Sequence, residues 1–293
     1  MTTQTWVTVV AHGTDVDFRA WGSELSTKLA AVGLVKTSDT GQINWTTVTR
    51  PGVNTAAGYE IWRFDDTLQA TAPLVLKIEY GTANSAATPS MWVTVGTGSN
   101  GSGTIIGQAT ARQQVTAPQA VGASSYPSYL CALAGHVGLA WKVGAQSGAA
   151  GTGLFAVTRT HDAAGVATAD GYMFYYGNST SSPTLTQCVR TAATAVAYAA
   201  SDAYSIVPGM PASASAGTDF MVYAHFGVSP GVWINPMLAT VNVTTTPPNA
   251  TFSAAMSGGA AKTMLSVGGL FRPLVTFVGP ATSSAYGFAM AWE

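Results

Sequence analysis

The pattern of hydrophobic and polar positions along the chain predicts many short β-strands. In the stretch LVLKIEY, Leu76, Ile78 and Tyr80 alternate with Lys77 and Glu79. Strict alternation of this kind indicates an antiparallel strand with one buried face and one solvated face. Similar stretches are YEIWRF from Tyr59, YLCALAGHVGLAWKV from Tyr129, GLFAVTRT from Gly153, GYMFYYG from Gly171, DFMVYAHFGV from Asp219, MLATVNVTT from Met237, RPLVTFVG from Arg272 and YGFAMAW from Tyr286.

Turn-forming residues separate these strands at Asn100-Gly101, Gly165, Asp170-Gly171 and Gly177-Asn178. Many short strands separated at regular intervals by turn residues are typical of a β-sandwich or β-barrel. We therefore expect a mainly β fold, an antiparallel β-sandwich or barrel-like architecture. The chain is expected to form one large β-rich unit over 1–293, or an N-terminal domain of 1–120 and a C-terminal domain of 121–293. The Gly, Ala, Ser and Pro-rich stretches near 96–128 and 208–218 are the candidate hinges or loops.

One segment has the periodicity of a helix instead. Phe18, Trp21, Leu25 and Leu29 recur at spacings of three and four, which forms an apolar stripe. Thr14 can cap the N-terminus of this helix, and Gly33 stands where a C-terminal glycine stop is expected. The pattern predicts one substantial helix near 14–33. Its stripe either packs on the protein's own sheet or forms a partner interface.

Composition changes the picture mainly through charge. Only 9% of the 293 residues are charged, where about 25% is usual for a soluble domain, and the formal net charge is −1. A near-neutral chain without a basic cluster is not expected to bind nucleic acid. Because protein interfaces are depleted in charge, this composition predicts a homo-oligomer with extensive interfaces. No apolar run reaches the roughly 18 residues of a membrane span, and the N-terminus lacks the pattern of a signal peptide.

The stretch Gly96-Thr97-Gly98-Ser99-Asn100-Gly101 spells the G-x-G-x-x-G motif of dinucleotide-binding loops. That motif needs a helix after it, whose N-terminus holds the pyrophosphate, and an acidic residue about 20 positions on. The residues that follow, SGTIIG, suit a second strand, and no acid lies at that distance. We therefore expect a loop between two antiparallel strands and no nucleotide cofactor.

Other candidate chemistry is sparse. His12, His136, His161 and His225 each have a structural explanation, and a metal or proton-relay role for His161 would require it to converge with Asp162 and Asp170. Cys131 and Cys188 are expected to be buried thiols, although a disulfide between them stays open. We predict no catalytic residue, no cofactor and no metal site, and hence no enzyme.

Three segments carry a resemblance to a known family. They are DFRAWGSELSTKLAAVGLVKTSDTGQINWTTV from Asp17, AAGYEIWRFDDTLQATAPLVLKIEYGTA from Ala56 and PSMWVTVGTGSNGSGTI from Pro89. Together they resemble a family of tailed-bacteriophage virion structural proteins.

The resemblance implies a non-catalytic component of the phage particle, in the tail or the head–tail region, made in the host cytoplasm and carrying no catalytic residues. Its partners would be other copies of itself, with a trimer as the first guess from the habits of phage β proteins, and other virion proteins. Two alternatives are a capsid decoration protein and a receptor-binding or glycan-degrading tail component. In the second, Trp92, Tyr175 and Tyr176 could stack on sugars of the host surface.

Overall fold

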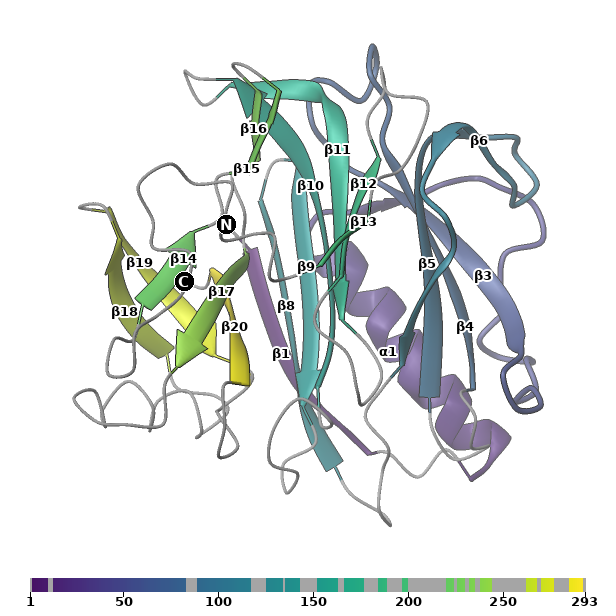
Figure 1. The fold of residues 1–293 in the computed structure, drawn as a ribbon. Helices are drawn as coiled ribbons and strands as arrows, with labels where there is room; N and C mark the ends of the chain where they lie inside the picture. Colours follow the sequence, from purple (N-terminus) through teal and green to yellow (C-terminus); the bar gives the residue numbers. More distant parts are fainter. Residues whose placement is uncertain are drawn as a thin grey trace.

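The structure is a computed structural model, and it shows a mainly β protein with an N-terminal helix (Figure 1). The helix α1 spans Asp15–Ala31. The residues that the structure describes are 2–9, 13–82, 89–116, 125–133, 135–142, 152–162, 166–176, 184–188, 197–199, 220–223, 226–229, 232–234, 238–243, 262–267, 270–276 and 285–291.

The described strands form three antiparallel sheets. A six-stranded sheet has the order β2-β3-β4-β5-β6, with β7 also paired to β5. Its strands are β2 (Val35–Lys36), β3 (Ala56–Arg63), β4 (Val75–Thr82), β5 (Pro89–Ser99), β6 (Ile105–Ala109) and β7 (Gln113–Thr116). A five-stranded sheet, drawn in yellow and green in Figure 1, has the order β14-β17-β20-β19-β18. Its strands are β14 (Phe220–Tyr223), β17 (Leu238–Val243), β18 (Lys262–Val267), β19 (Leu270–Thr276) and β20 (Ala285–Ala291).

The third sheet has nine strands in the described residues and the order β1-β8-β9-β10-β11-β12-β13, with β16 joining β10 to β15. Its strands are β1 (Thr2–Val9), β8 (Ser125–Leu133), β9 (His136–Lys142), β10 (Thr152–Asp162), β11 (Ala167–Tyr176), β12 (Thr184–Cys188), β13 (Ala197–Ala199), β15 (Phe226–Ser229) and β16 (Val232–Ile234).

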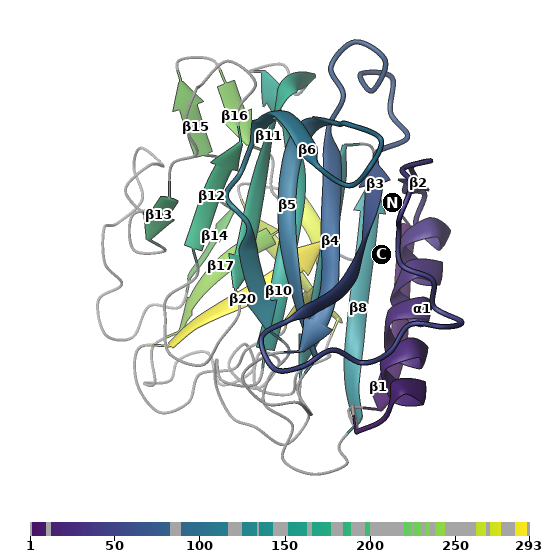
Figure 2. The ribbon, with the colours of Figure 1, turned by 90° about the vertical axis from the view of Figure 1, so that its right-hand side faces the viewer.

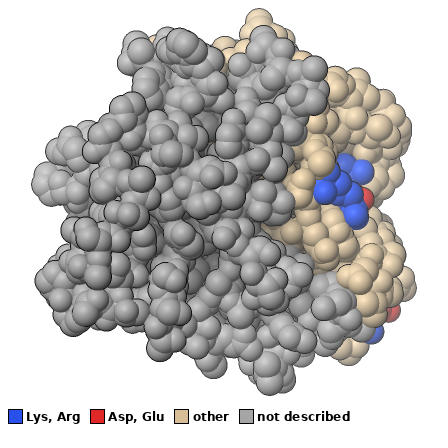
Figure 3. All heavy atoms as spheres, viewed as in Figure 1, with Lys and Arg blue, Asp and Glu red and all other residues tan. Residues whose placement is uncertain are grey.

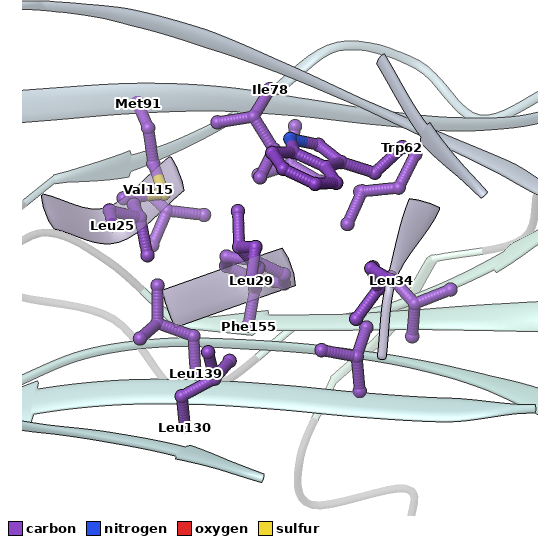
Figure 4. Close-up of a cluster of buried hydrophobic side chains, with 14 of the residues drawn as sticks. Leu25, Leu29, Leu34, Trp62, Ile78, Met91, Val115, Leu130, Leu139 and Phe155 are labelled. Atoms are coloured by element: carbon purple, nitrogen blue, oxygen red, sulfur yellow. The ribbon is translucent and has the colours of Figure 1, made fainter. Parts of the chain in front are cut away.

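The six-stranded and nine-stranded sheets pack face to face as a sandwich, and α1 runs along one open side between them (Figure 2). Figure 4 shows Leu25 and Leu29 of α1 between Ile78 of the six-stranded sheet and Leu139 of the nine-stranded sheet. The fold class predicted from the alternating pattern is therefore confirmed. This core draws on residues from both sides of position 120, and the proposed division into two domains stays a prediction.

The helix begins and ends as its sequence predicts. The backbone N–H of Asp17 donates to the Thr14 hydroxyl over 3.2 Å, and Gly33 adopts a φ of +94° at the C-terminal end. The predicted stripe is buried: Phe18 and Leu29 are 0% exposed, and Trp21 and Leu25 also lie in the core. The stripe thus packs inside this chain.

Two details of the strand pattern differ from expectation. The run from Tyr129 is two strands, because Gly135, with a φ of +73°, reverses the chain between β8 and β9. The turn predicted at Asp170-Gly171 is wrong, since both residues lie inside β11. Gly171 is buried, and a Cβ there would lie 2.8 Å from Leu74 Cδ1. The glycine allows close approach of the two sheets and does not form a turn.

Candidate functional site

The glycine-rich motif forms part of a hairpin. Strand β5 pairs with β6 in antiparallel fashion, with Ser99 opposite Ile105, and residues 100–104 connect the two strands. The prediction of a loop between antiparallel strands is confirmed. The chain continues into a strand after Gly101, so the loop does not lead into a helix N-terminus that could bind a phosphate.

This loop reaches the far edge of the six-stranded sheet. The carbonyl oxygen of Gly101 accepts from the Thr40 backbone N–H over 2.8 Å, and Tyr59 on β3 donates its hydroxyl to the Thr40 carbonyl over 2.5 Å. Gly103 packs closely against the Tyr59 side chain: its φ is +94°, and a Cβ there would lie 2.3 Å from the ring carbon Cζ. Glycine is needed at Gly103 both for the backbone conformation and for this contact.

Asp39 holds the loop in place. Its carboxylate accepts from the Ser99 hydroxyl through a short hydrogen bond, from the Gly103 backbone N–H over 3.2 Å and from the Thr37 hydroxyl over 2.7 Å. Burial acts to raise the pKa of Asp39, but the bonds from Ser99, Thr37 and Gly103 outweigh it, and the pKa lies below the usual value. The carboxylate is therefore ionised at neutral pH.

Aromatic and charged side chains lie side by side on the outer face of the same sheet. We call Tyr59, Lys77, Glu79, Trp92 and Arg112 the outer strip. The Lys77 ammonium lies 4.8 Å from the Tyr59 ring centre, and the Arg112 guanidinium lies 4.3 Å from the Trp92 ring centre. Arg112 also pairs with Glu79 at 2.7 Å. The positive charges of Lys77 and Arg112 therefore lie beside the carboxylate of Glu79 and over the rings of Tyr59 and Trp92.

The surroundings of Trp92 in the outer strip are relevant to the hypothesis that this ring stacks on a sugar of the host surface. Trp92 is 5% exposed and carries Arg112 over its ring, so this ring does not offer the open face that stacking on a sugar requires. Tyr175 and Tyr176 lie in β11, and their side chains fall outside the part of the chain that the structure describes. On the face seen in Figure 3, the described surface is mostly free of charged atoms apart from small groups of basic and acidic atoms.

A fully buried carboxylate lies between α1 and the six-stranded sheet. Glu60 on β3 is 0% exposed. Its Oε1 accepts from Ser26, Lys36 and Trp45 over 2.8, 2.6 and 3.1 Å. Its Oε2 accepts from the Tyr80 hydroxyl over 2.7 Å, and burial together with the Glu60 charge raises the pKa of Tyr80 well above its usual value. Tyr80 therefore stays a neutral donor, and the arrangement holds a charge without exposing it to a substrate.

A second buried ion pair joins the two facing sheets. Arg159 on β10 is 0% exposed, and its guanidinium binds both carboxylate oxygens of Asp66 at 2.6 and 3.0 Å. It also donates to the Ala72 carbonyl over 3.0 Å and to Gln69 over 3.3 Å. These bonds fix the segment between β3 and β4 onto the nine-stranded sheet. Asp66 serves as the anion of this contact.

The structure describes none of the four histidine side chains that the sequence singled out, so the proposed convergence of His161 with Asp162 and Asp170 stays a prediction. His136 begins β9 and His161 pairs with Ala167 across the β10–β11 hairpin, whereas His12 and His225 fall outside the described residues. The described part of the chain contains no cluster of three or more potential metal-ligating side chains. Cys131 is buried, and the side chain of Cys188 is not among those described, so a disulfide between them stays untested. No helix in that part is long and apolar enough to cross a membrane.

Sequence reasoning missed Glu60, Arg159 and Asp39 as organising residues. Of these three, only Glu60 could have been found from a local pattern. Alternate residues of a strand point to the same face, so Glu60 lies on the inward face of β3 with the buried Trp62. Comparisons of this chain with protein families, with curated proteins and with solved structures find no match.

Proposed function

We propose that this chain is a non-catalytic structural component of a tailed-bacteriophage particle, most directly of its tail or head–tail region. The proposal rests on the resemblance of residues 17–48, 56–83 and 89–105 to virion structural proteins. It also rests on physical features of the chain that are independent of that resemblance.

The observation that carries the proposal is the placement of the few charges. Only 9% of the residues are charged, and Glu60, Asp66 and Arg159 lie inside the fold. On the outer strip, Lys77 and Arg112 each pair with Glu79. On the described part of the chain, the exterior is consequently poorer in free charge than its composition suggests. Surfaces of this kind pack against other proteins without burying unpaired charges.

A sandwich with such surfaces suits repeated contacts around a symmetry axis. Virion components bind copies of themselves through identical or complementary patches. In a closed ring, each patch on one copy contacts the complementary patch on the next copy. We propose other copies of this chain, in the first instance a trimer, and other virion proteins as its partners. The chain would be made in the host cytoplasm and end in the virion.

Fractionation of purified particles tests the proposal. Heads and tails of the phage that encodes the chain are separated, and each fraction is searched for its peptides by mass spectrometry, with the major head protein as a marker of contamination. We expect the chain in the tail or head–tail fraction. Many copies on isolated heads would instead make it a capsid decoration protein, and absence from the particles would overturn the virion proposal.

A further inference from the structure

The loop between β5 and β6 contains an exposed Asn-Gly pair. In such a pair the backbone nitrogen of the second residue can attack the side-chain amide carbon of the first, and a glycine without a Cβ offers little steric resistance. Asn100 and Gly101 are both exposed, and Gly101 has a φ of +81°. What distinguishes this pair is the set of groups around it.

The nucleophile is connected to a base. The backbone N–H of Gly101 donates to the Ser99 hydroxyl oxygen over 3.2 Å. The Ser99 hydroxyl in turn donates to the carboxylate of Asp39. A proton leaving Gly101 can therefore pass to Ser99 while the Ser99 proton passes to Asp39. Groups within hydrogen-bond reach of the proton are the requirement for general-base assistance.

The electrophile is held by two donors. The side-chain oxygen Oδ1 of Asn100 accepts from the backbone N–H of Ser102 over 2.9 Å and from that of Thr104 over 3.0 Å. When a nucleophile attacks the amide carbon, negative charge develops on this oxygen. Two fixed backbone N–H groups aimed at it act as an oxyanion hole.

We propose that Asn100 is a site of self-catalysed deamidation, promoted by the folded loop. Gly101 N bonds to Asn100 Cγ and loses its proton through Ser99 to Asp39. The tetrahedral intermediate then expels the amide nitrogen as ammonia, which takes up a proton from Asp39. The resulting succinimide is opened by water to aspartate or isoaspartate, so that one amide is exchanged for one carboxylate.

The product would change the outer face of the six-stranded sheet. A new carboxylate at position 100 would lie on the loop whose Ser99 and Gly103 bind the negative charge of Asp39. Repulsion between the two weakens the hold of Asp39 on the loop and thereby the contacts of the loop with Thr40 and Tyr59. The modification would thus loosen this face with time after folding.

The test is a time course of the purified full-length chain at neutral pH, with deamidation at position 100 followed by peptide mass spectrometry. The folded chain is compared with the same chain unfolded in guanidinium chloride. The variant Ser99→Ala breaks the relay, and the matched variant Thr37→Val removes a different hydrogen bond from Asp39 and leaves the relay in place.

We expect Asn100 to react at least about tenfold faster in the folded chain than in the unfolded one, a threshold below the roughly 10²–10⁴-fold that positioned acid–base groups contribute. Ser99→Ala should remove most of that gain, and Thr37→Val should keep it. A folded rate equal to or below the unfolded rate would show that the loop protects Asn100 and would overturn the proposal. Equal rates in Ser99→Ala and the unchanged chain would overturn the role of the relay. The ratio for the unchanged chain decides the first point even where a variant fails to fold.

Discussion

At the scale of single residues, buried charged side chains of this chain connect elements of the fold through hydrogen bonds. Glu60 is surrounded by four donors from α1, β2, the segment before β3, and β4, and Arg159 occupies both oxygens of Asp66. A buried charge is tolerated only when such partners replace water. The cost of removing one partner should therefore far exceed the cost of the same change on the surface.

The first prediction concerns Tyr80. Tyr80→Phe deletes the donor to Glu60 Oε2 and leaves part of a buried carboxylate without a partner, so we expect the free energy of unfolding to fall by about 1–3 kcal/mol. The control is Tyr59→Phe, which removes a hydroxyl that donates to Thr40 in an exposed setting and should cost less than about 1 kcal/mol. Urea unfolding curves measure both. Equal losses would contradict the role of the Glu60 cluster.

The second prediction concerns Arg159. Arg159→Leu leaves Asp66 buried and unpaired, and we expect a loss of about 3–5 kcal/mol in the free energy of unfolding. Arg112→Leu breaks an Arg–carboxylate pair whose arginine is 46% exposed and should cost no more than about 1 kcal/mol. Adding Asp66→Leu to Arg159→Leu should recover most of the loss, because no unpaired charge then remains. Failure to recover would mean that packing and not charge dominates at this position.

At the scale of elements, helix α1 is fitted between the two sheets by the size of its side chains. Phe18, Trp21, Trp45 and Tyr80 pack ring against ring, with the Trp45 and Tyr80 centroids 4.9 Å apart in an edge-to-face arrangement. The rings can approach because position 22 on the helix has no side chain. A Cβ on Gly22 would lie 1.9 Å from the Trp45 ring.

The third prediction follows from this contact. Alanine normally stabilises a helix interior relative to glycine by about 1 kcal/mol. Gly22→Ala should instead destabilise the protein by about 1–3 kcal/mol, because the new methyl group overlaps the packed Trp45 ring. Thr27→Ala, at an exposed position of the same helix, should be close to neutral. Thermal unfolding of both variants is the measurement, and a Gly22→Ala protein that melts higher than the unchanged chain would refute the packing described for α1.

How much the sequence predicts depends on the distance over which each feature is determined. Strand β4 and the helix after Thr14 follow from local periodicity and capping. The hydrogen bond between Asp39 and Ser99 joins residues 60 positions apart in the sequence, and the one between Arg159 and Asp66 joins residues 93 positions apart. No local sequence pattern predicts contacts over such separations. Gly171 was misread as a turn because a glycine at a turn and a glycine between packed sheets are identical in sequence.

At the scale of the whole molecule, two facing sheets and one helix form a sandwich, and several of its described charges are buried in ion pairs or paired on the outer strip. Such a body has few charges with which to repel its neighbours, and the proposed role in a virion gives those neutral faces partners. The proposed loosening of the outer face at Asn100 would then act on a surface available to a neighbour.

The most direct test of the virion proposal is a cryo-electron microscopy map of the intact phage particle. We expect density in the tail or head–tail region into which this chain can be traced, repeated around the symmetry axis, with its low-charge faces buried against neighbouring chains. A map in which other proteins account for all the density of these regions, with no copy of this chain elsewhere in the particle, would contradict the account.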